Sequence, residues 1–245
     1  MTDNNNRRSL VTLFLKMGVL AFPFLLLTAW YVWQDPFMVL HRYTPQQYDN
    51  SPYYQGEGYV GWEKLKQLCS RQRYDAFVLG NSCTRAFNSD DWNKYIPVKS
   101  FRLFSNNENL GDLCLKLHAL DSLYRYPVRY LLIIAEPSSF GSSLPQDGPM
   151  HVMPSEVSGE SMTKIQLTYF QAFLDTRFLL PYLRYQLTGR YDRSMKNRIS
   201  PWCPTRTLWA NNAILHQEDT IRLQGNRFWE GKDWADCDAE IAHPV

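Results

Sequence analysis

A short apolar run that ends in small polar residues is the part of the sequence best suited to chemistry. The run at residues 76–79 stops at Gly80 and is followed by Asn81 and Ser82. A continuous apolar run bounded by turn residues is typical of a buried strand in a parallel sheet. Because open α/β sheets hold ligands at the carboxyl ends of their strands, a serine just past such a strand can present its hydroxyl to a ligand. Ser82 is therefore the candidate nucleophile.

Three segments are predicted to be strands, at residues 75–79, 98–104 and 130–135. The last is apolar throughout, so we expect it to be buried on both faces. A helix is predicted at residues 62–70, and another lies between the second and third strands, where apolar residues recur at helical spacing. That stripe consists of Leu110, Leu113, Cys114, Leu117 and Leu120.

This alternation of strands and helices predicts a doubly wound parallel sheet. In such a sheet the ends of the first and third strands flank the ligand crevice. Those ends carry Gly80-Asn81-Ser82 and Glu136-Pro137-Ser138-Ser139, with the polar loop at residues 105–109 on the same rim.

The segments beyond the third strand are less regular. Residues 140–160 are rich in Gly, Ser and Pro, which predicts a lid or a surface loop with His151 on its surface. Residues 161–187 have a wide apolar face typical of a long helix. Pro181 is expected to kink or split that helix, and two separate helical pieces are equally compatible with the pattern.

The Gly80-Asn81-Ser82 stretch resembles the Gly-Asp-Ser motif of the SGNH (GDSL-like) hydrolase superfamily. An apolar N-terminal helix followed by Asp35-Pro36-Phe37 is also similar to bacterial membrane-anchored SGNH-like envelope proteins. The resemblance extends loosely from residue 10 to about residue 190. It implies a three-layer, flavodoxin-like parallel sheet domain behind a membrane anchor, and an esterase or O-acyltransferase acting on cell-envelope glycans.

The resemblance also implies roles for particular residues. Ser82 would be the nucleophile, and the oxyanion donors would be its own amide and a loop amide near Asn107. The family's base comes from a C-terminal Asp-x-x-His, whose nearest counterpart here is Glu240-Ile241-Ala242-His243. The family's second motif has no clear glycine here. Its third motif is missing, because the third strand continues into Glu136-Pro137 with no Gly-x-Asn.

These departures lead to a hypothesis about the end of the chain. Only three strands are predicted, and the third would lack a neighbour on one side and leave an apolar edge. We therefore expect a C-terminally shortened, incomplete member of the superfamily. Coding sequence just past the stop codon that encodes a further strand and an Asp-x-x-His would support this hypothesis.

The N-terminus predicts a membrane anchor. Arg7, Arg8 and Lys16 precede an uncharged segment at residues 17–33, and the apolar region as a whole exceeds the ~20 residues needed to cross a bilayer. The basic residues before the span favour a cytoplasmic N-terminus, with a single pass and the main domain outside. The resemblance to bacterial envelope proteins implies that this membrane is a bacterial inner membrane. A cleaved signal peptide is the alternative, with Thr28-Ala29 before its cleavage site.

The sequence thus divides into a cytoplasmic tail (1–9), an anchor (10–33), a juxtamembrane connector (34–61), an SGNH-like domain (62–190) and an irregular C-terminal tail (191–245). The connector holds several tyrosines, which would either rest among lipid headgroups or pack under the domain. A platform for carbohydrate is a further possibility for them.

Composition excludes several classes of function. The net charge of +2 over 245 residues gives no basic surface for nucleic acid. The five cysteines show no metal-binding spacing, so we expect no metal and no cofactor. Cys83 lies beside Ser82 at a predicted helix N-terminus, where its pKa would be lowered, or else it simply packs.

Two functions from different classes remain. One is an anchored serine esterase or acyltransferase whose partners are the lipid bilayer and an envelope polysaccharide or acyl-transfer partner. The other is a catalytically inert envelope scaffold or interaction protein that lacks the Asp-x-x-His motif.

Overall fold

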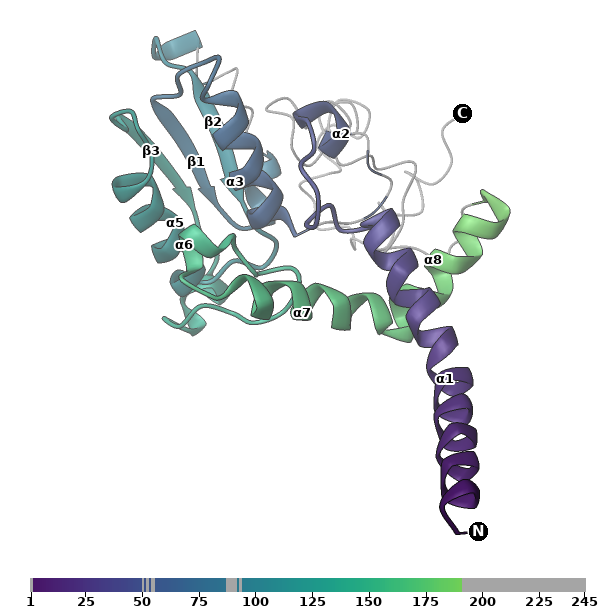
Figure 1. Ribbon diagram of the computed structural model, residues 1–245. Coiled ribbons are helices and arrows are strands. Elements are labelled where there is room, and N and C mark those ends of the chain that lie inside the picture. The colour runs from purple at the N-terminus through teal and green to yellow at the C-terminus, as the bar shows by residue number, and fades with distance from the viewer. Residues whose placement is uncertain are drawn as a thin grey trace.

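The computed structural model describes residues 2–49, 51, 53, 56–86, 92 and 94–190. It shows a long N-terminal helix attached to an α/β domain, as Figure 1 shows. The C-terminal tail, with His243, lies outside the described residues, as does the family's expected base motif.

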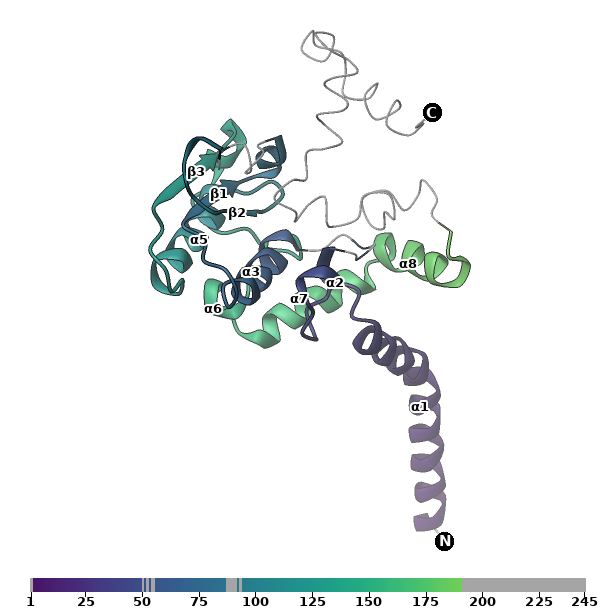
Figure 2. The same cartoon turned by 90° about the horizontal axis from the view of Figure 1, so that it is seen from above.

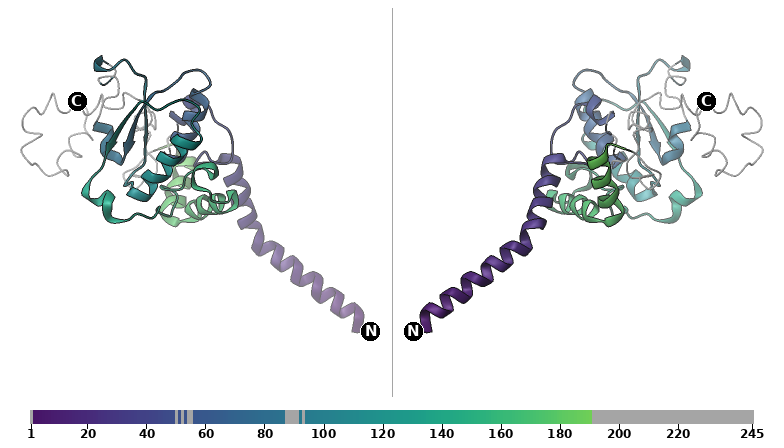
Figure 3. Two further views of the ribbon diagram at one scale, coloured as in Figure 1. Left: turned by 90° about the vertical axis from the view of Figure 1, so that its left-hand side faces the viewer. Right: turned by 90° about the vertical axis from the view of Figure 1, so that its right-hand side faces the viewer.

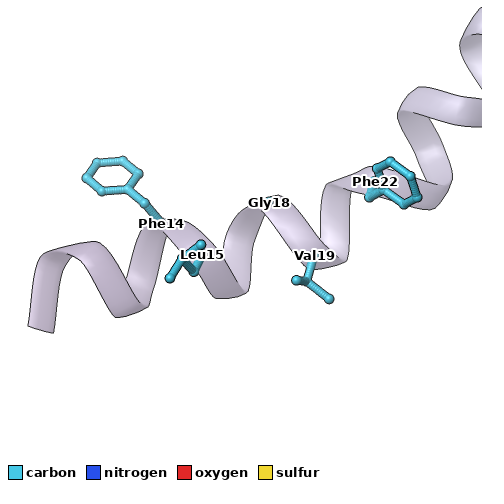
Figure 4. Close-up of a pocket in the computed structure, with 5 residues that line it drawn as sticks. All are labelled: Phe14, Leu15, Gly18, Val19 and Phe22. Carbon is cyan, nitrogen blue, oxygen red and sulfur yellow. The ribbon is translucent and has the colours of Figure 1, made fainter.

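Helix α1 (Thr2–Gln34) extends away from the domain (Figure 3). Its segment Thr12–Gln34 is long and apolar enough to cross a membrane, a property that a signal sequence shares. Pro23 lies inside the helix, and the ribbon bends near Phe22, the residue before it (Figure 4). The helix and its composition therefore match the segment predicted as an anchor, and they fit the signal-sequence alternative as well.

The sheet has three parallel strands, β1 (Ala76–Gly80), β2 (Ser100–Phe104) and β3 (Tyr130–Ile134), in the order β2-β1-β3. Phe77 pairs in register with Phe101 on one side and with Leu131 on the other. Every residue of β1 and β2 is buried. The prediction of a parallel α/β sheet is confirmed.

The prediction that the third strand is buried on both faces is wrong. Leu131 and Ile133 are 42% and 41% exposed, respectively. Within the part of the chain described, β3 pairs with β1 alone, so the predicted apolar edge is present.

Two helices pack on one face of the sheet. Helix α3 (Glu57–Leu68) begins five residues earlier than expected, inside the predicted connector, because Tyr59 and Val60 are buried with it. Helix α5 (Leu110–Ser122) contributes Leu113 and Leu120 to the same apolar cluster as Phe77 and Leu79 of β1.

The predicted stripe of α5 is only partly right. Cys114 is exposed and Leu117 is only half-buried, whereas Asp112 and Lys116 are buried on the face toward the sheet. Asp112 and Lys116 face inward because their polar partners lie on that side of the helix, as described below.

The remaining elements join the domain to α1. The short helices α2 (Pro45–Asp49), η2 (Pro137–Gly141) and α6 (Ser155–Ser158) lie in the connections. Helices α7 (Met162–Leu174) and α8 (Thr176–Thr188) then run back beside α1 (Figures 1 and 2).

The break between α7 and α8 falls at Asp175 and not at Pro181. The Asp175 backbone is extended, and its carboxylate accepts a hydrogen bond from the Arg177 amide, so it caps a new helix. Pro181 lies inside α8. The two-helix alternative is therefore correct, but the predicted position of the break is wrong.

An aromatic cluster fixes α1 to α7 and α8. It includes Tyr31 of α1, Phe37 of the following loop, and Tyr169, Phe173 and Tyr182. Two connector tyrosines, Tyr48 and Tyr59, are buried in it. For these two residues the packing interpretation is correct.

The loop after α1 is held by one carboxylate. Asp35 accepts hydrogen bonds from the amides of Val39, Leu40 and His41 and from the Tyr43 hydroxyl. The Asp35-Pro36-Phe37 sequence thus forms a compact turn that delivers Phe37 into the aromatic cluster.

Candidate functional site

Gly80 ends β1 in a conformation that only glycine adopts easily. Its φ is +125°, and a Cβ there would lie 1.9 Å from the Ile134 carbonyl oxygen of β3. The Gly80 carbonyl accepts a hydrogen bond from the Ser105 amide just beyond β2. The ends of all three strands therefore meet at Gly80, because no side chain separates them.

The residues after Gly80 form a tight polar turn. The buried Asn81 side chain accepts a hydrogen bond from the Cys83 amide at 3.0 Å, and the Asn81 carbonyl accepts one from the Thr84 amide. This turn starts a 3-10 helix, η1 (Ser82–Ala86). Ser82 is therefore its first residue, directly past the carboxyl end of β1, as predicted.

The Ser82 side chain is partly exposed, and its hydroxyl makes no hydrogen bond with another described residue. Three histidines are described, and no interaction joins any of them to Ser82. His41 contacts the Val32 carbonyl, His151 faces Asp112, and His118 is exposed on α5. Ser82 therefore lies at the end of the strand, but no described histidine is in a position to act as its base.

Cys83 and Glu136 connect the ends of β1 and β3. The Cys83 thiol donates a hydrogen bond to Glu136 Oε1 at 2.5 Å. This hydrogen bond raises the pKa of the thiol, and partial burial and the negative charge of Glu136 raise it further. The prediction of a lowered pKa at Cys83 is wrong, because a carboxylate opposes the thiolate. The packing alternative is wrong as well, since Cys83 is exposed.

Glu136 also organises its own side of the crevice. It precedes η2, and its side chain and that of Ser139 cap each other's backbone in a capping box. Ser138 donates a long hydrogen bond of 3.5 Å to Glu136 Oε2. Glu136 is thus the described carboxylate that faces the Ser82 turn from β3.

Asn107, the second predicted oxyanion donor, lies on the loop after β2. It is exposed, with a φ of +49°, and its carbonyl accepts a hydrogen bond from Gln146 Nε2. No interaction between described residues joins Asn107 to Ser82. The structure therefore holds the two residues on neighbouring strand ends without bringing them into contact.

A buried polar network fills the carboxyl end of β2. Lys116 Nζ, fully buried on α5, lies 2.7 Å from Glu108 Oε1 and donates hydrogen bonds to Ser105 Oγ at 2.8 Å and to the Leu103 carbonyl. Burial raises the pKa of the Glu108 carboxyl, while Lys116 acts in the opposite direction. From the other side, Glu57 of α3 accepts a hydrogen bond from the Asn106 amide at 2.6 Å.

The segment after β3 is joined to this region by hydrogen bonds. The backbone amide of Gln146 donates a hydrogen bond to Asp112 Oδ1, and its side-chain Nε2 donates one to Asp112 Oδ2, each at 2.9 Å. Asn109 caps α5 through the Asp112 amide and also donates to the Leu144 carbonyl. Most residues from 141 to 150 are exposed, so the surface-loop alternative is correct here, and Gln146 and Leu144 fix this loop to the domain.

The prediction of a surface histidine at position 151 is wrong. His151 is mostly buried, and its Nδ1 lies 3.6 Å from Asp112 Oδ2. Burial lowers its pKa, and Lys116 adds to that effect, while Asp112 opposes it. His151 is part of the β2 network and makes no contact with the Ser82 turn.

Other parts of the described chain offer less chemistry. No group of three or more His, Cys, Asp or Glu side chains within it is arranged to hold a metal. An apolar hollow of about 570 Å³ lies along α1, lined by Phe14, Leu15, Gly18, Val19 and Phe22 (Figure 4). Its lining residues are all apolar, and it lies in the segment whose length and composition suit a membrane span or a signal sequence.

Comparisons of the chain with protein-family models, with curated proteins and with solved structures find no match. The functional argument therefore rests on the geometry at the ends of β1 and β3. Sequence reasoning identified Ser82 and the facing segment, but it missed the Cys83–Glu136 contact and the role of Gln146. For the Cys83–Glu136 contact, the sequence did offer a signal, which was the carboxylate directly after the third strand.

Proposed function

We propose that this chain is a membrane-anchored, SGNH-like protein that transfers or hydrolyses acyl groups through Ser82, on glycans of a bacterial cell envelope. The observation that supports it best is the position of Ser82. It begins a 3-10 helix at the carboxyl end of the central strand, beside β3, where the strand order reverses because the chain passes from β1 to β2 on one side and then to β3 on the other. In parallel sheets with this strand order, ligands bind at that switch point.

The chemistry follows from the groups around the turn. The Ser82 oxygen would attack the acyl carbonyl while its proton passes to a base, and amides at Ser82 and near Asn107 would stabilise the oxyanion. The bond to the leaving alcohol would then break, the base would return the proton to that alcohol, and water or a second alcohol would take the acyl group from Ser82. His243, the base that the resemblance implies, lies outside the described residues. Among the described residues, Glu136 is the carboxylate connected to the Ser82 turn, through Cys83.

The location follows from α1. The basic residues before its apolar segment favour a cytoplasmic N-terminus, with a single pass and the α/β domain outside the inner membrane. The bilayer is then the first partner of the chain, and an envelope polysaccharide or acyl-transfer partner would meet the crevice.

Covalent labelling of the full chain in detergent with a fluorophosphonate probe tests this proposal. We expect labelling of the wild type, loss of labelling in Ser82→Ala, and retention in Ser138→Ala, a matched change on the opposite rim. Equal labelling of the wild type and Ser82→Ala would contradict the assignment of Ser82.

A second function, a catalytically inert envelope scaffold, is favoured by one specific observation. Within the described residues, the Ser82 hydroxyl has no partner that could remove its proton, whereas the β2 network nearby is densely paired. A chain that unfolds cooperatively but does not react with the probe would be such a scaffold.

A further inference from the structure

Helices α7 and α8 expose leucines on the side away from the domain. Leu167, Leu180 and Leu187 are 51%, 62% and 82% exposed, respectively. The opposite faces of the two helices are buried, through Phe173 in α7 and Tyr182 in α8. The spacing of 180, 183 and 187 places three leucines along one side of α8. An amphipathic helix in water would normally expose polar residues on this side.

These two helices lie against the part of α1 that enters the membrane. The ring of Phe170 is 6.0 Å from that of Phe24, and the rings of Trp30 and Tyr182 are 6.1 Å apart. Figures 1 and 2 show α7 and α8 beside the domain end of α1. The leucines of α7 and α8 are therefore close to the membrane boundary.

The depth of the contact follows from helix geometry. A bilayer core of ~30 Å takes ~20 helical residues at 1.5 Å each. A span that begins at Leu10, the first apolar residue after Arg8, reaches the far boundary near Ala29, and a span that begins after Lys16 reaches further along the chain. Phe24 then lies at least ~7 Å inside the boundary. Phe170, which contacts it, must reach that depth.

The charges of α8 suit the same location. Arg177 and Arg184 lie on the exposed side of the helix, near Leu180 and Leu187, and Arg190 follows its end. Arg177 is paired with Asp175 at 2.7 Å. No acidic residue occurs within α8 itself. Arginines beside exposed leucines are typical of helices that lie at a lipid surface and contact phosphates.

We propose that α7 and α8 form a collar around the anchor that lies in the outer interface of the membrane, with leucines 167, 180 and 187 in lipid and the arginines at phosphates. This inference rests on the membrane anchoring in the proposed function and is independent of the chemistry at Ser82. Figure 1 shows the strand arrowheads pointing to the side where α6 and α7 lie. The collar therefore holds the crevice close to the lipid surface.

Spin labels on the full chain in lipid nanodiscs test the collar. A nitroxide is attached through a genetically encoded keto amino acid at position 180 or 187, and its accessibility to oxygen and to a water-soluble nickel complex is measured. A label at Tyr95, which is 87% exposed at the opposite end of the sheet, is the control for water. A label at Leu20 in α1 is the control for lipid.

We expect the labels at 180 and 187 to be accessible to oxygen and protected from nickel, as at Leu20, with the opposite pattern at Tyr95. Water accessibility at 180 and 187 with lipid accessibility at Leu20 would overturn the collar and leave the anchor intact. Protection from both reagents would indicate a protein partner and also overturn it. Water accessibility at Leu20 would overturn both the collar and the anchor, whatever the outcome of Ser82 labelling.

Matched substitutions give a second measurement. Leu180→Glu with Leu187→Glu places charge in lipid if the proposal is right. A nitroxide attached at position 167, which should be protected from nickel in the wild type, should lose that protection in the double variant. Leu123→Glu changes an exposed leucine at the end of α5 and should leave that label unaffected. An unchanged label in the double variant would overturn the proposal.

Discussion

The ends of β1 and β2 lie side by side in the sheet, but their polar residues are organised differently. Past β2, the groups on Lys116, Glu108 and Ser105 are buried and bound to one another. Past β1, Ser82 is partly exposed without a described hydrogen-bond partner, and Cys83 has an exposed contact with Glu136. Buried ionic groups persist in a fold only when they are paired, whereas an exposed serine costs little.

This difference separates a structural role from a functional one. The network at β2 lies between α3, α5 and the loop that contains Gln146, so it fixes the shape of the sheet's carboxyl edge. The turn after β1 lies at that edge, and its Ser82 hydroxyl makes no hydrogen bond with another described residue. Residues in the network should therefore affect stability when changed, and residues in the turn should affect reactivity.

The largest expected effect comes from removing the buried cation. Lys116→Met leaves Glu108 buried without its partner, which should reduce the free energy of unfolding by about 3–5 kcal/mol. Denaturant unfolding of the full chain in detergent, followed by tryptophan fluorescence, measures the loss.

Two further variants test that interpretation. Lys116→Met combined with Glu108→Leu should recover most of the stability, because both charges are then gone. Lys66→Met removes an exposed lysine that is paired with Glu63 and Glu156, and it should cost no more than about 1 kcal/mol. A small loss in Lys116→Met, equal to that of Lys66→Met, would show that the network is not structural.

A second large effect is expected where the two regions join. Gly80→Ala forces a side chain into a φ of +125° and against the Ile134 carbonyl. The backbone conformation alone should cost about 1–3 kcal/mol, and the contact adds to it. Gly141→Ala, at a position with open space around its Cβ, is the control for the same denaturant measurement and should be near neutral.

The sequence predicted the architecture well where the signal was local. Apolar runs bounded by turn residues located β1 and β3, and an uncharged segment after Lys16 located most of α1. The cap that Asn109 provides for α5 is a local contact of the same kind, since the side chain that caps a helix precedes it directly.

The parts that sequence did not predict depend on distant partners. Lys116 turns inward because Ser105 and Glu108 lie beneath it, and Cys83 contacts Glu136, 53 residues away. The apolar pattern predicted that Cys114 is buried and that β3 is buried on both faces, and both predictions were wrong. Neither the exposure of one strand's side chains nor an ion pair leaves a periodic pattern in the sequence.

A smaller effect should appear as pH dependence in the network. Burial lowers the pKa of His151 from its ordinary value of 6.5, so the unfolded chain binds a proton more readily than the folded chain. Stability is then fully present above pH 6.5 and is lost as the pH falls through the folded pKa. Asp112 and Lys116 face the ring and act in opposite directions on it.

Unfolding midpoints measured between pH 5 and pH 8 test this point. The wild type should lose stability on acidification, and His151→Gln should flatten the profile in that window. His118→Gln, on the exposed face of α5, should leave the profile unchanged. An equal slope in His151→Gln and the wild type would assign the pH dependence to other groups.

The smallest effect on stability, and a clear one on reactivity, is expected at the turn. Glu136→Gln removes the negative charge beside Cys83, and this should lower the pKa of the thiol and speed its alkylation by iodoacetamide at pH 8. Stability should change by no more than about 0.5 kcal/mol, because the contact is exposed. Cys114, exposed on α5, serves as the internal reference when the two modified sites are quantified by mass spectrometry. Faster alkylation at Cys83 alone would show that Glu136 controls the chemistry of the turn that carries Ser82. A large loss of stability without a change in rate would instead place Glu136 with the structural network, and the distinction between the two strand ends would fail.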